Sequence, residues 1–585
     1  MAALVLLTPS ALGAEVGAEP GTQPIVRYAV LNVSGALPES LPPIYLFERE
    51  GDTLHGMLGR IDRARRDGRV SGIILRLRGY TGGWAKAQEL REALAECRAA
   101  GKDVICLLES ADNLDYYVAT AAGRIVMLPT GWLFLSGLRA ESIFAGELLD
   151  KVGIKPQLVQ VGKYKGAADP MTRTDFSQPF RTALQAVLDS YYSQLREGLT
   201  EGRGLPVSRA EVLFRRGPFS ARAAREADLV DDVMFYDQLV EGLRRQHEGR
   251  LVAEAGYGRP EPKSPFQGGQ FNLLQMLMGG RMPTRRAPSG PAIAAIHATG
   301  PIVMESDDEL PLGEQMVGAR RLVRTIRRAA GDSSVKAIVL RVDSPGGSAM
   351  ASDLIWHALR QADEVKPVVA SFSDTAASGG YYIGAGARAI VAEPGTLTGS
   401  IGVLGGKLVL TELLGKLGLR VDVVESGPGA GMLSPFKEFS GDEQARVEQM
   451  MREIYETFIE RVAETRPGMA YRDVEMVAEG RIWTGRQAHE NGLVDHLGGL
   501  DKAVAVAREA AGIPQDVDLR IVHLPRPKNL AEVLLFGKGE EVALREQLRP
   551  ELLRHFPRVR SYLAALLAVR DEMAVCLMPA IVTIR

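Results

Sequence analysis

The sequence predicts an α/β protein made of two tandem βαβ domains, and two observations carry this prediction. The first is an internal repeat, in which VSGIILRLRGYTGG (70–83) matches VKAIVLRVDSPGG (335–347). Each segment is a β-branched run that ends in a Gly-Gly turn. The second is the order of elements, because a helical pattern follows each turn and an apolar strand follows each helix. This order is typical of a parallel sheet with right-handed crossovers.

The repeat extends along most of the chain. The matching segments are 28–37 with 294–303, 70–83 with 335–347, 104–110 with 368–374, and 220–232 with 484–496. The offset stays at 264 to 265 residues from the Gly-Gly turns to the last pair. Chance similarity does not hold a register over most of a domain, so the pattern indicates a duplication.

The boundaries follow from composition. We expect a leader or short apolar N-terminus at 1–25, a first repeat domain at 26–257, a Pro/Gly-rich linker at 258–291, a second repeat domain at 292–515 and a tail of amphipathic helical character at 516–585. The linker contains the apolar patch FNLLQMLM (271–278), which could dock on a domain or touch a membrane surface. The tail ends in an apolar stretch (574–584) that is too short to span a bilayer.

The N-terminus favours export. Residues 2–14 are apolar and end in small residues, like the central and cleavage regions of a signal peptide, although no Lys or Arg precedes Arg27. A frayed terminus is the alternative interpretation.

Composition excludes several classes of function. The chain is 46% hydrophobic and 24% charged, as in ordinary globular proteins, and its net charge of −2 with no basic block argues against nucleic acid as a partner. The three cysteines match no metal motif, and neither Gly-Gly turn fits a nucleotide fingerprint. We therefore expect no metal and no cofactor.

A candidate nucleophile lies in SDTAASGGYYIGAGA (373–387), where Ser378 follows an apolar strand and precedes two glycines. Glycines there allow a tight turn and close approach of a substrate backbone. The alternative is that Ser378 only caps a helix. In the turn of VDSPGGSAM (342–350), the backbone amides of Gly346 and Gly347 could stabilise an oxyanion, as could that of Gly379. A plain strand-to-helix turn is the alternative for these glycines.

The candidate base is a lysine, because the eight histidines match no triad motif and no GxSxG elbow surrounds Ser378. Lys165 enters a Gly/Ala segment after an apolar strand, although lysines in such loops are usually solvated. In the repeat alignment Lys165 lies opposite Gly429, and Ser378 lies opposite Asn113. Each copy thus holds half of a Ser/Lys dyad, which predicts an active site shared between the two domains.

The motifs AASGGYY, DSPGG, TLTGSIG (396–402) and GKYKGAADP together resemble the signal peptide peptidase (protease IV) family in its tandem-duplicated form. The resemblance implies a ClpP/crotonase-like fold, with Ser378 as nucleophile and Lys165 as general base. It also implies a membrane-associated homo-oligomer, most simply a tetramer, at the periplasmic side of the inner membrane. Its implied substrates are cleaved signal peptides and other extended apolar peptides.

The expected reaction is peptide hydrolysis through an acyl-enzyme, for which Lys165 must be neutral and therefore desolvated. Ser400 in TGSIG is a candidate to hold the Lys165 amine, with a plain turn serine as the alternative. Lys163 should point to the opposite face of its strand. Two other functions stay open at this point: a crotonase-type acyl-CoA enzyme and a non-catalytic membrane scaffold.

Overall fold

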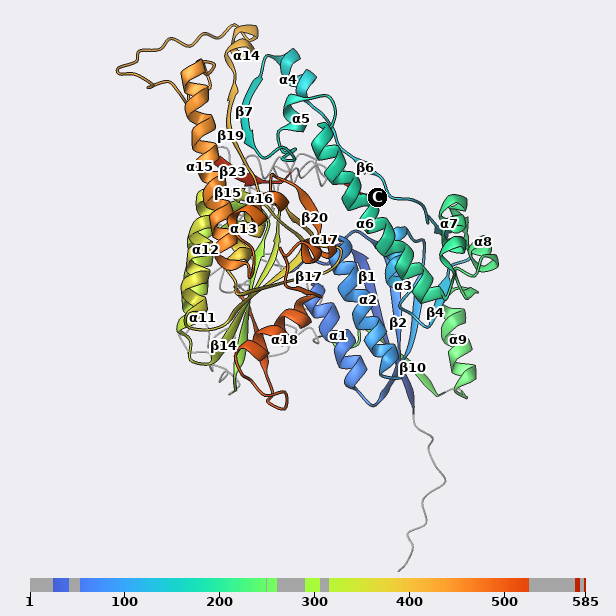
Figure 1. Ribbon diagram of the computed structural model, residues 1–585. Coiled ribbons are helices and arrows are strands. Elements are labelled where there is room, and N and C mark those ends of the chain that lie inside the picture. The colour runs from blue at the N-terminus through green and yellow to red at the C-terminus, as the bar shows by residue number, and fades with distance from the viewer. Residues whose placement is uncertain are drawn as a thin grey trace, which may run out of the picture.

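The computed structural model describes residues 25–40, 53–248, 250–259, 290–305, 315–525, 574–578 and 583–584 (Figure 1). Most of the expected leader and linker, including the patch at 271–278, lies outside these residues. Among the described residues, no helix combines the length and the apolar character needed to cross a membrane.

The first copy is built on a parallel sheet of six strands with helices on both faces. The strand order is β10 (Leu251–Ala255), β1 (Val26–Gly35), β2 (Val70–Tyr80), β3 (Asp103–Leu108), β4 (Arg124–Met127) and β9 (Asp232–Val233). One face packs against α1 (Leu54–Arg66), α2 (Trp84–Ala99), α3 (Asn113–Ala119) and α6 (Gln178–Arg203). The other face packs against α9 (Tyr236–Gln246). Burial of the strands on both faces explains their continuous apolar runs.

The second copy repeats this plan. Its central strands are β18 (Leu397–Gly399), β16 (Val368–Ala377), β14 (Val335–Ser344), β11 (Ala292–Thr299) and β22 (Arg520–Leu524), with β20 (Ile482–Thr484) antiparallel at one edge. Helices α11 (Ala319–Gly331), α12 (Ala349–Asp363), α13 (Gly379–Ala385) and α15 (Gly441–Thr465) cover one face, and α18 (Leu500–Ala510) covers the other. The predicted fold class, two tandem α/β units, is confirmed.

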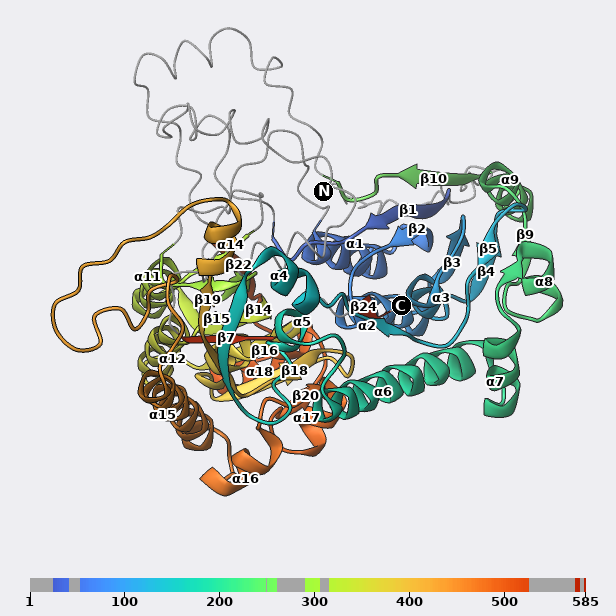
Figure 2. The same cartoon turned by 90° about the horizontal axis from the view of Figure 1, so that it is seen from above.

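A third sheet joins the two copies. Its order is β13 (Val317–Gly318), β12 (Ile302–Val303), β15 (Gly346–Ser348), β23 (Ala574–Leu577), β19 (Val403–Val409) and β7 (Lys155–Val161). Strand β7 comes from the first copy and pairs antiparallel with β19 of the second over its whole length. Helix α6 also bridges the copies, and Figure 2 shows it running from one to the other. These connections carry the segment after β7 into the second copy.

The tail differs from the expectation. Its described parts are strands rather than helices: β22 extends the second-copy sheet, β23 lies between β15 and β19, and β24 (Thr583–Ile584) pairs with β6 (Ala140–Glu141). Residues 526–573 lie outside the described part. Strand β23 is extended because it pairs with the backbone of β15 and β19 on its two sides, and such pairing overrides local helical preference.

Buried charges also hold the copies together. The guanidinium of Arg341 in β14 is fully buried and hydrogen bonds to both carboxylate oxygens of Glu39 in the first copy, at 3.0 and 2.9 Å. It also contacts Glu89 of α2. Nearby, the amine of Lys86 pairs with Asp343 at 2.8 Å. Removing one partner of a buried ion pair destabilises the fold strongly, because the other charge is then left buried without compensation.

Replacing Arg341 with methionine is therefore expected to lower the free energy of unfolding by about 3 kcal/mol, because Glu89 is left buried without its cation and Glu39 keeps only Lys86, at 4.0 Å. Urea denaturation followed by fluorescence measures the change. The matched control is Arg222→Met, which removes an exposed pair with Glu226 and should have little effect. Equal losses in the two variants would contradict the interpretation.

Candidate functional site

Ser378 lies at the junction between β16 and α13 and is fully buried. Its backbone has φ 57° and ψ −115°, a conformation rare for a residue with a side chain. The backbone is held there by hydrogen bonds from Ser378 N–H to Gly399 O and from Tyr382 N–H to Ser378 O, each 2.8 Å long. The side chain makes no capping hydrogen bond to α13, so capping does not explain this serine. Local strain of this kind clusters at functional sites.

Lys165 follows β7 and enters the second copy with its amine buried. Its Nζ lies 2.7 Å from Ser378 Oγ, 2.9 Å from Ser400 O and 3.1 Å from Ser400 Oγ. A neutral amine has two N–H donors and one lone pair. It can therefore donate to both Ser400 oxygens while it accepts the Ser378 hydroxyl proton. The two halves of the predicted dyad meet within one chain.

Burial controls the charge of this lysine. Loss of hydration lowers the pKa of Lys165 to about 7, against a weaker opposite effect of Cys576. Lys163, two residues earlier, instead points outwards and pairs with Glu479, and this partner raises its pKa. The alternation predicted for the two lysines is present. Lys165 is thus the one of the pair that can be neutral near physiological pH.

The predicted glycine turn lies beside Ser378. Gly346 and Gly347 have positive φ values of 99° and 157°, and a Cβ on Gly346 would lie 2.7 Å from the amide nitrogen of Gly379. A Cβ on Gly379 would lie 3.1 Å from the amide nitrogen of Gly347. The N–H of Gly346 already donates to Ser344 Oγ at 3.2 Å. The arrangement therefore favours the amides of Gly347 and Gly379 as oxyanion donors over that of Gly346.

The counterparts of the dyad have structural roles. Asn113, opposite Ser378, accepts a hydrogen bond from Ser136 N–H at 3.1 Å, and Gly429, opposite Lys165, lies in an exposed turn. The residue that sequence reasoning missed is Cys576, which is buried in β23 against the same turn. The sequence feature that could have pointed to Cys576 is the apolar stretch at 574–584, which contains it.

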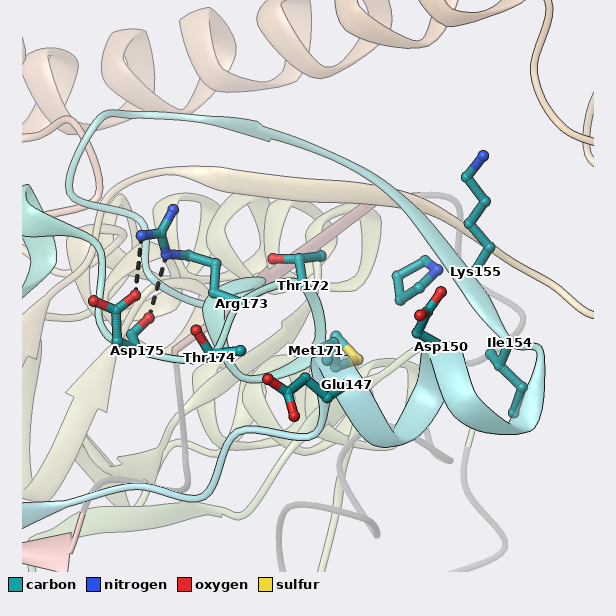
Figure 3. A pocket seen from close by; sticks show the side chains of 11 residues that line it. Glu147, Asp150, Ile154, Lys155, Met171, Thr172, Arg173, Thr174 and Asp175 are labelled. Carbon is teal, nitrogen blue, oxygen red and sulfur yellow. Dashed lines mark hydrogen bonds and ion pairs between the residues drawn. The ribbon is translucent and has the colours of Figure 1, made fainter.

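A polar hollow of about 530 Å³ lies near β7, between α4 (Gly146–Val152) and α5 (Asp169–Thr172) (Figure 3). Charged side chains line it, and two of them, Arg173 and Asp175, pair with each other. Ser378 and Lys165 do not line it. In the part of the chain that the structure describes, no cluster of three or more His, Cys, Asp or Glu side chains is placed to hold a metal ion.

Known proteins match both copies. The family model of peptidase family S49 matches residues 96–249 and 360–514, one stretch in each copy. The chloroplastic serine protease SPPA of Arabidopsis thaliana is 33% identical over 82% of this chain and 69% of its own length. Protease 4 of Salmonella typhi is 32% identical over 79% of this chain and 73% of its own. A solved membrane-bound stomatin-specific protease covers 41% of this chain and 100% of its own, at 16% identity and a TM-score of 0.27.

Proposed function

Since the chain belongs to peptidase family S49 and is a serine peptidase, we propose that Ser378 is its nucleophile and Lys165 its general base. The observation that carries the proposal is the 2.7 Å contact between Lys165 Nζ and Ser378 Oγ. Both side chains are buried, and the amine has its pKa lowered to about 7 by loss of hydration. A base with a pKa near the working pH is suited to proton transfer.

The proposed reaction uses these contacts. Neutral Lys165 accepts the Ser378 hydroxyl proton while Oγ attacks the peptide carbonyl, and Ser400 keeps the amine in place. The carbonyl oxygen becomes an oxyanion that the amides of Gly347 and Gly379 stabilise. The protonated Lys165 then gives its proton to the leaving amine, and an acyl-enzyme forms. Water deprotonated by Lys165 hydrolyses this ester and regenerates the serine.

The experiment that tests the dyad is labelling with a fluorescent fluorophosphonate. Wild-type protein and Lys163→Ala should be labelled on Ser378, whereas Ser378→Ala should not be labelled. Lys165→Ala should be labelled much more slowly, because its serine keeps its proton. Labelling of Ser378→Ala at the wild-type rate would contradict the assignment. An acyl-CoA enzyme or a non-catalytic scaffold, the two earlier alternatives, would show no such serine-dependent labelling.

We further propose that the substrates are extended apolar peptides such as cleaved signal peptides, and that the enzyme acts at the periplasmic side of the inner membrane. The support is the motif set shared with signal peptide peptidases and an apolar cluster that starts directly after Lys165, with Ala167 and Ala168 packed against Leu404 of β19. Membrane fractionation after expression in a Gram-negative host tests the location. Recovery of the protein in the soluble fraction at all salt concentrations would contradict it.

We infer a homo-oligomer from the internal repeat. Strands β7 and β19 pair with each other, and the repeat offset gives each a counterpart, 419–425 for β7 and 139–145 for β19. The 419–425 segment is unpaired and extends away from the body of the chain (Figures 1 and 2). Val421 and Val423 in it are about half exposed. Within 139–145, Ala140 and Glu141 pair with β24 in a sheet of two strands, so 419–425 of a second molecule would pair with the other edge of β6. Such pairing is head-to-tail, and where its rotation closes it gives rings such as the tetramer that the family resemblance implies.

The double substitution Val421→Asp and Val423→Asp is therefore expected to reduce the molar mass measured by light scattering after gel filtration. Two buried carboxylates without partners would oppose strand pairing. Fluorophosphonate labelling should persist, because the dyad lies within one chain. The control is Val365→Asp, an exposed position at the end of α12 that should leave the mass unchanged. An unchanged mass in the double variant would overturn the inferred interface.

A further inference from the structure

Strand β23 fills a slot that is one strand wide. It pairs antiparallel with β15 through Gly347 and Cys576 on one side, and with β19 through Leu404 and Val575 on the other. The outer sides of β15 and β19 already pair with β12 and β7. Without β23, the facing edges of β15 and β19 would present unpaired backbone groups to each other across a gap of one strand.

This slot runs past the proposed active site. A Cβ on Gly346 would lie 1.9 Å from the carbonyl oxygen of Cys576, so the β23 backbone passes directly over the glycine turn. Two residues after Cys576, the N–H of Met578 donates to Pro345 O at 2.9 Å. The Cys576 thiol and the Lys165 amine are close enough to influence each other's pKa. Cys576 raises the pKa of Lys165, and Lys165 lowers that of Cys576, although burial has the larger effect on both. The same Cβ on Gly346 would lie 2.7 Å from the amide nitrogen of Gly379, so the Cys576 carbonyl oxygen and the residue after Ser378 both lie beside Gly346.

The side chains of β23 alternate between two apolar linings. Val575 and Leu577 pack in one apolar cluster. Its other members include Ala167 and Ala168, which follow Lys165 in the chain, and Val303 of β12. Cys576 points the other way, into the core of the second copy, and is fully buried. Backbone pairing on both sides with alternate side-chain pockets is how proteins bind extended peptides by strand addition.

We propose that residues 574–578 occupy the substrate groove, as a displaceable internal mimic of a bound peptide. This inference rests on the proposed function, because it places the scissile peptide beside Ser378. A substrate must displace β23 and pair with β15 and β19 in its place. Because β23 belongs to the same chain as the groove, its effective concentration there is high. Only a fraction of the molecules therefore has an open groove at any time. The pocket that holds Cys576 then selects a small side chain, and the pockets of Val575 and Leu577 select branched apolar ones.

Cys576 itself reports the displacement. In full-length Ser378→Ala, which cannot turn over, alkylation by iodoacetamide is followed by mass spectrometry with and without a fluorescein-labelled peptide. The peptide has the sequence of residues 572–579 with alanine in place of the cysteine. We expect the peptide to raise the alkylation rate of Cys576 at least tenfold. Cys97 and Cys106, buried in the first-copy core, are internal controls whose rates should not change.

Peptide binding detected by fluorescence anisotropy with no change in Cys576 alkylation would overturn the proposal, because the peptide would then bind elsewhere. If the peptide binds neither the full chain nor a variant with a disrupted β23, the proposal is overturned as well. If it binds only the variant with the disrupted β23, the proposal is supported, because a tightly bound β23 would exclude the peptide from the full chain.

A second variant keeps the test independent of binding. Val575→Pro removes a backbone donor from the middle of β23, where proline is poorly accommodated. We expect kcat/KM on a fluorogenic apolar peptide to rise about tenfold, because the state in which β23 fills the groove no longer competes with substrate binding. The control is Thr583→Pro, which lies in β24 and should leave kcat/KM unchanged. A folded Val575→Pro variant with unchanged or lower kcat/KM would mean that β23 is a permanent structural strand. Loss of fluorophosphonate labelling in every protein, wild type included, would instead overturn the proposed function.

Discussion

Replacing Ser378 with alanine is expected to lower kcat on a peptide ester by at least ~10³-fold, and Lys165→Ala should have an effect of the same order. The two residues act as one unit, since the lysine amine is the group placed to take the serine proton. The double variant should therefore be hardly slower than either single variant. Steady-state kinetics with active-site titration measures all three.

The matched control is Lys163→Ala, which removes a lysine two residues away whose amine is exposed and paired with Glu479. It should keep most of the wild-type kcat. Circular dichroism and thermal melting establish that each inactive variant is folded. If Ser378→Ala or Lys165→Ala retained more than a few per cent of kcat, the dyad assignment would be wrong.

Replacing Lys165 with methionine is expected to stabilise the protein by about 4 kcal/mol at pH 7 while abolishing turnover. Burial lowers the pKa of Lys165 to about 7 in the folded protein, whereas the unfolded chain has the ordinary value near 10.5. Between these values the unfolded state binds more protons, so the stability of the wild type rises with pH. The destabilisation caused by burying Lys165 is therefore at its maximum below pH 7 and decreases as pH approaches 10.5.

Thermal melts of wild type and Lys165→Met between pH 6 and pH 10 measure this difference, which should shrink as pH rises. In parallel, kcat/KM of the wild type should rise along a limb with a midpoint near pH 7, because only the neutral amine accepts the proton. Equal melting temperatures of the two proteins at every pH would mean that the lysine is hydrated and that another group is the base.

The sequence by itself predicted the repeated α/β unit and both residues of the proposed dyad. Strand and helix periods and Gly-Gly turns are local signals, so each copy could be identified from its own residues. The fixed offset then set Ser378 against Asn113 and Lys165 against Gly429, and this complementary loss pointed to one shared site. The resemblance to a family of proteases named the same two residues.

Only the tertiary structure decided how the site is completed. The helical pattern of the tail did not predict β23, because an extended conformation there depends on pairing with β15 and β19, which are far away in the sequence. The lowered pKa of Lys165 likewise depends on burial by the second copy, and Arg341 is held by carboxylates of the first copy. Local patterns specify elements, whereas desolvation and strand pairing arise from residues that meet only when the chain has folded.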